Sequence, residues 1–161
     1  LRGRIDAVAS AQQAIGTTGD TTLVSLTDTI EGALAPFLSA REWRGRISVD
    51  TQETTVSPSL GQAIALSIYE LATNAIKYGA FLYDGGSVRL TCRLRQAPER
   101  LELTWDEQHS GNQIEVATQG SGFGTKLIER LVRSEKGTIE RRVESGAYRV
   151  RLSFALNHAS G

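Results

Sequence analysis

The sequence predicts an α/β fold, a two-layer sandwich in which a mixed, largely antiparallel sheet carries helices on one face. Segments with apolar residues at helical spacing interleave with segments that alternate apolar and polar residues, as strands do. The strands of the C-terminal half follow one another across short turns, which favours antiparallel pairing. The chain has 161 residues, of which 40% are hydrophobic, and this is enough for one domain with a sizeable core.

The N-terminal part is predicted to be an amphipathic helix followed by a turn-rich linker, together covering residues 1–19. The main domain then covers residues 20–161. Its first helix is predicted over residues 23–38, where apolar residues recur at helical spacing, and Pro36 is expected to weaken the last turn.

A strand and a long helix follow in the predicted order. Residues 46–50 alternate as a strand, and a second short extended piece is expected around Val56. Ser57 is a good helix cap, and Pro58 suits the first helical turn, where its missing N–H costs nothing. The helix that starts there has no internal proline, and its apolar periodicity continues up to Gly79.

The C-terminal half is predicted to supply most of the sheet. Turn residues separate each of its strands from the next, and one further helix interrupts them. In chain order we expect a turn at 84–86, a strand at 87–95, a turn at 97–100, a strand at 101–105, a helix from 125, and a hairpin of 137–143 with 147–154.

Three polar residues of the long helix share one face. Glu70, Asn74 and Lys77 stand at positions i, i+4 and i+7. Carboxylate and amide oxygens suit Mg²⁺ or water bound to it, and lysine offers a point charge for phosphate. The alternative is a surface helix whose charged groups are simply solvated.

A glycine-rich loop stands directly before the later helix. Gly120, Gly122 and Gly124 precede Thr125 and the apolar periodicity that follows. Glycines let the backbone approach a ligand closely, and a helix N-terminus favours an anion, so such a loop can hold phosphates. The loop lacks the lysine of a Walker motif and the strand context of a dinucleotide fingerprint, and a plain turn is the alternative.

The strand that begins at Leu101 ends in acidic residues. Leu101, Leu103 and Trp105 alternate on one side, and Glu107 follows in the same register at the strand's end. A carboxylate there could accept a hydrogen bond from an exocyclic amine such as N6 of adenine. The alternative is a core tryptophan beside solvated acids.

The order of these motifs resembles the nucleotide-binding domain of histidine kinases, within the wider ATPase superfamily that includes gyrase and MutL. The segment 70–80 resembles the N box, 105–107 the W-x-E signature of the HWE subfamily, and 122–128 the G2 box. The resemblance covers about residues 20–155, and it implies the Bergerat-type ATP-binding fold. Three motifs in the right order are more specific than any one alone.

The resemblance implies a role for each candidate residue, with ATP and Mg²⁺ as the ligands. It implies Asn74 as the Mg²⁺ ligand, Glu70 as a residue that supports the metal shell or polarises a nucleophile, and Glu107 as the adenine-recognition residue. Lys77 and Tyr78 would meet phosphate. The phosphate loop would comprise Gly120, Gly122, Phe123, Gly124 and Thr125, and the segment 108–119 would form a short ATP lid.

Two departures from the subfamily pattern affect the prediction. The subfamily usually has small residues after W-x-E, whereas this chain has Gln108, His109 and Ser110, and we expect His109 to be an exposed loop residue. The only other histidine is His158, and neither has the context of a phosphoacceptor. The simplest account is a fragment cut between the two helices of a phosphotransfer hairpin, and a natural stand-alone or degenerate relative is the alternative.

Composition narrows the class of protein. The 18 basic and 18 acidic residues balance, which argues against a general nucleic-acid binder. The single cysteine, Cys92, is compatible with the cytosol and is expected to be buried, and we find neither a membrane-length apolar run nor a signal peptide. The basic residues Arg141, Arg142, Arg149 and Arg151 are interpreted as a solvated strand face.

The preferred prediction is a bacterial cytoplasmic protein histidine kinase domain that binds Mg-ATP and transfers the γ-phosphoryl group to a histidine supplied elsewhere. Implied partners are the phosphoacceptor helix and sensor domain of the parent protein and a response regulator, with a possible homodimer through the parent and no direct membrane contact. Two alternatives stay open. One is a degenerate nucleotide sensor or partner-binding module, including an anti-sigma-like serine kinase, and the other is an ATPase switch.

Overall fold

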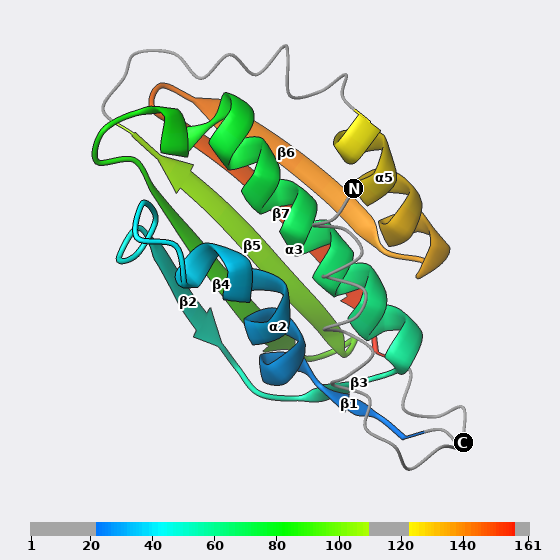
Figure 1. Ribbon diagram of the computed structural model, residues 1–161. Helices are drawn as coiled ribbons and strands as arrows, with labels where there is room; N and C mark the ends of the chain where they lie inside the picture. Colours follow the sequence, from blue (N-terminus) through cyan, green and yellow to red (C-terminus); the bar gives the residue numbers. More distant parts are fainter. Residues whose placement is uncertain (1–21, 110–122, 157–161) are drawn as a thin grey trace.

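The computed structural model describes residues 22–109 and 123–156, which form a five-stranded sheet and a separate two-stranded sheet with helices packed against them (Figure 1). The elements are β1 Val24–Ser25, α2 Leu26–Leu38, β2 Ile47–Thr51, β3 Thr55–Val56, α3 Pro58–Tyr78, the 3₁₀ helix η1 Ala80–Leu82, β4 Ser87–Arg95, β5 Arg100–Gln108, α5 Phe123–Ser134, β6 Thr138–Glu144 and β7 Ala147–Ala155. The predicted helix and linker at residues 1–19 lie outside the described residues.

The larger sheet has the strand order β2-β4-β5-β7-β6. The edge strand β2 runs parallel to β4, and the other neighbouring pairs are antiparallel. Short turns join β4 to β5 and β6 to β7, and these two pairs are antiparallel as short turns require. Between β2 and β4 the chain passes through α3, and this long connection permits their parallel pairing. The predicted mixed, largely antiparallel sheet is confirmed.

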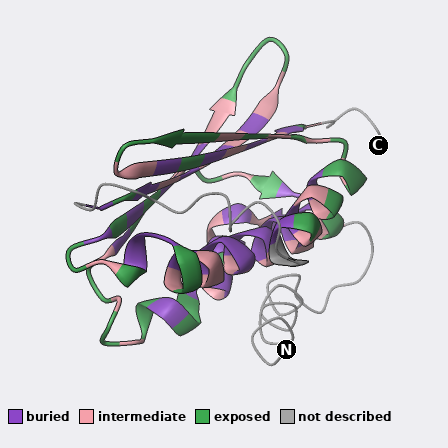
Figure 2. Cartoon of the chain, turned by 90° about the horizontal axis from the view of Figure 1, so that it is seen from above, coloured by how far each residue is buried: buried purple, intermediate pink, exposed green. Residues whose placement is uncertain are grey.

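Helices α2, α3 and α5 cover one face of this sheet, and the other face carries no helix among the described residues (Figures 1 and 2). The strands alternate between buried apolar residues on the helical side and polar residues on the open side, as β5 does with Leu101, Leu103 and Trp105 facing inward. Cys92 is buried in the same core, as expected. The predicted two-layer architecture is therefore confirmed, and α3 lies at its centre, between α2 and α5.

Local sequence explains where α3 begins. Ser57 has extended backbone angles, and its hydroxyl oxygen accepts a hydrogen bond from the Leu60 N–H at 3.2 Å. Pro58 occupies the first turn. The helix then runs without interruption to Tyr78, so the predicted start and length are confirmed.

The start of α2 differs from the prediction. Instead of beginning at residue 23, the helix begins at Leu26, because Val24 and Ser25 pair with β3 as a short antiparallel strand. Ser25 caps the helix by accepting a hydrogen bond from the Asp28 N–H at 3.2 Å. Pro36 lies inside the last turn, and the helix still continues to Leu38.

One of the four C-terminal arginines does not lie on the solvated sheet face. Arg141 alternates with Arg142 along β6, so its side chain lies on the helical side, where it contacts Glu129 of α5 at 2.9 Å. Arg142, Arg149 and Arg151 are on the open face, as predicted. Arg141 and Arg142 lie on opposite faces because successive side chains of a strand alternate between the two sides of the sheet.

Among the described residues, no helix is both long enough and apolar enough to cross a bilayer.

Candidate functional site

Helix α3 carries the three polar residues of the candidate site on one face. Glu70 is buried, Asn74 one turn later is half-buried, and Lys77 in the last turn is exposed. The burial of Glu70 is incompatible with the alternative in which all these groups are simply solvated. Tyr78 closes the helix and is 39% exposed. From Glu70 towards the C-terminus of α3, the side chains on this face therefore change from a buried carboxylate to a solvent-exposed cation.

Helix α5 runs antiparallel to α3 beside this face. At one end of the pair, the Ser59 hydroxyl lies 2.9 Å from Glu135 Oε1, and Ile128 and Val132 are buried on the inner side of α5. Ten residues of helix span about 15 Å. Counted back from Glu135, this places Thr125 beside the part of α3 that contains Glu70. Figure 1 shows α5 running alongside α3 on the same face of the sheet.

The N-terminus of α5 therefore faces the polar part of α3. Phe123 and Gly124 are the first residues of this helix, and Thr125 is buried at 4% exposure. Free N–H groups and the helix dipole favour an anion at such a position. Gly120 and Gly122 of the predicted phosphate loop, and most of the predicted lid at 108–119, lie outside the described residues.

Glu107 of β5 meets the other end of α3. Its side chain is 2% exposed; Oε1 accepts a hydrogen bond from the Ala80 N–H at 3.0 Å, and Oε2 accepts one from the Trp105 indole at 2.9 Å. Burial raises the pKa of the Glu107 carboxyl, and these two hydrogen bonds oppose that shift. Trp105 is thus a core residue. Glu107 is not solvated, and its hydrogen bond with the Ala80 N–H connects β5 to the end of α3.

Gly79 makes this contact possible. A Cβ atom at this position would lie 2.1 Å from Glu107 Oε1 and 3.0 Å from the Ala75 Cα. Only a residue without a side chain lets the carboxylate reach the Ala80 N–H. The glycine that ends the helical pattern in the sequence is therefore required by a contact with a strand far away in the chain.

His109 differs from the prediction. It is buried rather than exposed, and its ring stacks on Tyr83 with the ring centroids 4.1 Å apart and an angle of 8° between the planes. Its backbone N–H also donates to the Gly146 carbonyl at 3.0 Å. The sequence rule for loop histidines fails here because Tyr83, 26 residues earlier, supplies a flat partner that no local pattern reveals.

The His109 contact predicts an acid-sensitive stability. Burial lowers the pKa of His109 below its ordinary value of 6.5. The unfolded chain then binds more protons than the folded one as the pH falls below 6.5, so the free energy of unfolding decreases there. We expect urea titrations between pH 7.5 and 5.5 to show this loss for the wild type and a smaller one for His109→Phe, which keeps the stack; identical slopes would contradict it.

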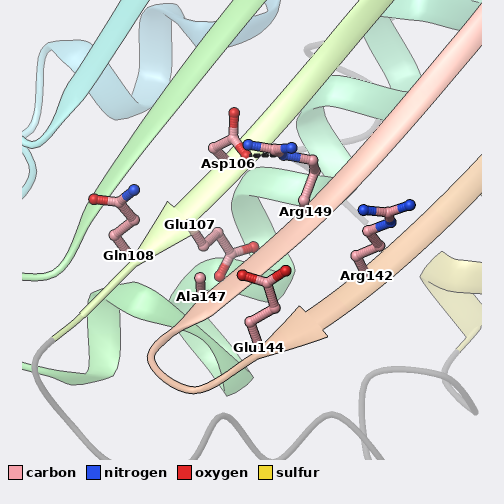
Figure 3. A pocket seen from close by; sticks show the side chains of 7 residues that line it. All are labelled: Asp106, Glu107, Gln108, Arg142, Glu144, Ala147 and Arg149. Atoms are coloured by element: carbon pink, nitrogen blue, oxygen red, sulfur yellow. Dashed lines mark hydrogen bonds and ion pairs between the residues drawn. The ribbon is translucent and has the colours of Figure 1, made fainter.

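A small cavity lies at the end of β5, β6 and β7 on the open face of the sheet (Figure 3). It has a volume of about 120 Å³ and is lined by Asp106, Glu107, Gln108, Arg142, Glu144, Ala147 and Arg149. Arg149 Nε and Asp106 Oδ1 form an ion pair at 2.5 Å. Apart from Glu107, none of the predicted site residues in the described part of the chain lines it, because α3 and α5 lie on the helical side of the sheet.

Sequence reasoning missed Arg46 and Tyr83. Arg46 precedes β2 and donates hydrogen bonds to the carbonyls of Gly86 and Tyr83, both at 2.7 Å. Tyr83 stacks on His109 in turn. Neither residue belongs to a motif, and no spacing in the sequence connects them to the site.

Comparisons with known proteins identify the relatives of this chain. A blue-light-activated histidine kinase from Erythrobacter litoralis is 27% identical over 159 residues, which is 98% of this chain and 43% of that protein. A blue-light-activated histidine kinase from Brucella anthropi is 34% identical over 118 residues, covering 72% of this chain and 23% of that protein. No protein-family model matches the chain.

The fold has solved counterparts as well. The histidine kinase domain of a blue-light-activated histidine kinase from Erythrobacter litoralis superposes with a TM-score of 0.78 at 20% sequence identity, over 96% of this chain and 74% of that one. The chain spans less than half the length of the curated relatives it matches. Sequence relatives and fold agree: the chain is a relative of the HWE-type histidine kinases and has the fold of their ATP-binding catalytic domain.

Proposed function

We propose that this chain is the catalytic domain of a two-component sensor histidine kinase, which binds Mg-ATP and transfers the γ-phosphoryl group to a histidine on another segment or chain. The observation that carries the proposal is the polar face of α3, where half-buried Asn74 stands between buried Glu70 and exposed Lys77. This face lies beside the N-terminus of α5. Oxygen donors next to a helix N-terminus suit a metal bound to a phosphate chain.

The residues present fit a magnesium ion and a triphosphate. The Asn74 amide oxygen would be the direct metal ligand, and the Glu70 carboxylate would hold a water of the metal shell. Lys77 and Tyr78 would contact the phosphates from α3, and the amides of Gly124 and Thr125 would contact them from the start of α5. Gly122, which precedes that helix in the sequence, would belong to the same phosphate loop. When bound, the metal supplies charge neutralisation at the transferring phosphoryl group.

Catalysis by these residues is mainly alignment. A neutral imidazole on the acceptor attacks the γ-phosphorus, the bond to the β–γ bridging oxygen breaks, and ADP leaves with that oxygen. Because the imidazole is itself nucleophilic, a base need only remove its ring proton, and Glu70 or solvent can take it. Lys77 and the α5 amides would stabilise the negative charge that develops on the departing oxygen.

We further propose that Glu107 recognises adenine. Its two oxygens accept from Ala80 and Trp105, yet each carboxylate oxygen has a second lone pair that can accept from the adenine N6 amine or a bridging water. The protein hydrogen bonds would then hold the carboxylate in one orientation. In this role the Glu107 carboxylate would accept hydrogen bonds from the protein and from the ligand at the same time.

Glu107→Gln tests that role. One carboxylate oxygen becomes an NH₂ group, which cannot accept from either Ala80 or Trp105, so we expect weaker ATP binding by about tenfold and a lower melting temperature. The preference for ATP over GTP should also shrink, and calorimetric titration of both nucleotides would measure it. An unchanged ratio of the two affinities would remove Glu107 from the adenine site, whatever the change in stability.

The setting of the domain in its parent protein is also a proposal. The phosphoacceptor helix and a sensor domain would belong to the parent protein, which would signal to a response regulator and could form a homodimer. This domain would lie in the cytoplasm of a bacterial cell. Residues 1–19 would be a helix and linker that form a remnant of the phosphotransfer hairpin, and the catalytic domain would comprise 20–161.

A nucleotide-binding module without phosphotransfer is the second candidate. It is favoured by His109, whose ring fills a position where the HWE kinases have small residues and packs on Tyr83. The two candidates differ in one measurement. The chain is incubated with ATP carrying a labelled γ-phosphate and with the phosphoacceptor helix as a separate polypeptide. Acid-labile label on that helix supports the kinase, whereas ATP binding without transfer supports the binding module.

A further inference from the structure

We propose that Arg46 is a positioning residue for the nucleotide site. The inference rests on the proposed function, and it concerns the loop of residues 79–86, which connects α3 to β4. This loop begins where Lys77 and Tyr78 end the helix. Arg46 itself is far from these residues in the sequence and reaches the loop from the start of β2.

The Arg46 guanidinium holds the loop at several points. Nε donates to the Gly86 carbonyl at 2.7 Å, and Nη2 donates to the Tyr83 carbonyl at 2.7 Å and more weakly to the Ala80 carbonyl at 3.5 Å. The group also lies 5.1 Å from the centroid of the Phe81 ring, within range of a cation–π contact. One planar group thus fixes both ends and the middle of the loop.

The backbone of Arg46 is fixed as well. Its N–H donates to the Trp43 carbonyl at 3.0 Å, and its carbonyl accepts from the Val88 N–H at 2.8 Å, where β2 joins the sheet. The guanidinium therefore projects from a rigid base at the sheet edge. Its position does not depend on a flexible connection.

The opposite side of the same loop contacts β5 and its C-terminal end. The Ala80 N–H donates to Glu107 Oε1, and the Tyr83 ring stacks on His109. Within the loop, the Tyr83 N–H donates to the Ala80 carbonyl at 3.2 Å. Arg46, the loop and Glu107 form one connected set of hydrogen bonds, so a shift of the loop moves the Ala80 N–H away from the carboxylate.

The contacts made by Arg46 require an arginine side chain, and a positive charge alone does not provide them. The fork of the guanidinium reaches the carbonyls of Gly86 and Tyr83 through two different nitrogens while its central carbon lies over the Phe81 ring, and a lysine ammonium has no such fork. With the loop held, Glu107 keeps one orientation and the last turn of α3 keeps its direction. Arg46 therefore acts on nucleotide affinity through Ala80 and Glu107, without touching the ligand.

The test compares Arg46→Gln, Arg46→Lys and the control Arg100→Gln. Arg100 lies at the other end of β5, about 23 Å from Glu107 along the strand, and its Nε donates to the Ser153 hydroxyl at 2.8 Å. The control therefore removes an arginine and a hydrogen bond without touching the loop. Each variant is studied at a temperature where circular dichroism shows it to be folded.

Two quantities are measured, the Kd for Mg-ATP and the hydrogen exchange rate of the Ala80 amide. The exchange rate is taken relative to that of the Leu103 amide in the middle of β5, which corrects for a loss of global stability. For Arg46→Gln we expect a Kd about tenfold higher and selectively faster Ala80 exchange, as the loss of two charge-assisted hydrogen bonds implies. Arg46→Lys should fall between it and the wild type, and Arg100→Gln should stay within about twofold of the wild type, since its bond is remote.

A folded Arg46→Gln protein with wild-type Kd and wild-type relative exchange at Ala80 would overturn the inference. An equal rise of Kd in Arg100→Gln would overturn it too, because the effect would then come from stability alone. Failure of the proposed function looks different. In that case the wild type does not bind ATP at all, and the exchange of Ala80 still decides whether Arg46 holds the loop.

Discussion

Asn74→Ala is expected to abolish measurable Mg-dependent ATP binding, with a loss of affinity of about a hundredfold. The amide oxygen is the proposed metal ligand, and removal of a contact to a charged group costs about 1.5–3 kcal/mol. Because Asn74 is half-buried, its truncation should leave the fold intact. Calorimetric titration of ATP with and without Mg²⁺ measures the effect, and the difference between the two titrations should vanish in the variant.

The control for this variant lies in the same helix. Thr73 directly precedes Asn74, and its hydroxyl donates a hydrogen bond to the Tyr69 carbonyl at 2.8 Å, so this hydroxyl is already engaged within the helix. Thr73→Ala should therefore bind Mg-ATP like the wild type. If Asn74→Ala binds as tightly as Thr73→Ala, the assignment of the metal site to α3 is wrong.

The second large effect is on stability. A Cβ atom at Gly86 would lie 1.8 Å from the Ala80 carbonyl oxygen and 2.7 Å from its carbonyl carbon. Both atoms are backbone, so Gly86→Ala must displace the loop that Arg46 and Glu107 hold. We expect a loss of about 3 kcal/mol or more in the free energy of unfolding, at the upper end of overpacking costs, measured by urea denaturation.

The neighbouring glycine provides a matched control. Gly85 has a φ of +76°, and a Cβ atom there would meet nothing within 4 Å. Gly85→Ala should cost only about 1–2 kcal/mol, the price of left-handed backbone in a residue with a side chain. Equal losses for the two variants would show that backbone angles, and not the contact with Ala80, determine the effect at Gly86.

Much of the fold could be predicted because its signals are local. The cap at Ser57, the periodicity of α3 and the turn residues between the later strands each act within a few residues. The face shared by Glu70, Asn74 and Lys77 follows from helix geometry alone. The parallel pairing of β2 at the sheet edge was not specified by any such pattern, since a short strand before a long helix can join a sheet in several places.

Several contacts of the site could not be predicted because they join residues far apart in sequence. Glu107 has its partner at Ala80, and His109 has its partner at Tyr83. Whether an acid or a histidine at a strand end is exposed depends on which loop packs over it, and that is a property of the tertiary structure. Arg46 is the clearest example, because an arginine before an edge strand has no distinctive pattern.

The burial of Glu107 also affects the hydration change that accompanies ligand binding. A solvent-exposed carboxylate must shed its ordered water before it can accept a donor from a ligand, and that step opposes association. In this protein the water is removed when the chain folds, and the backbone of Ala80 and the indole of Trp105 take its place. A purine amine arriving at the site would thus find an acceptor that is already dry and oriented. Selectivity between nucleotides would then depend more on the shape of the residues around the base than on competition between the ligand and water for the carboxylate.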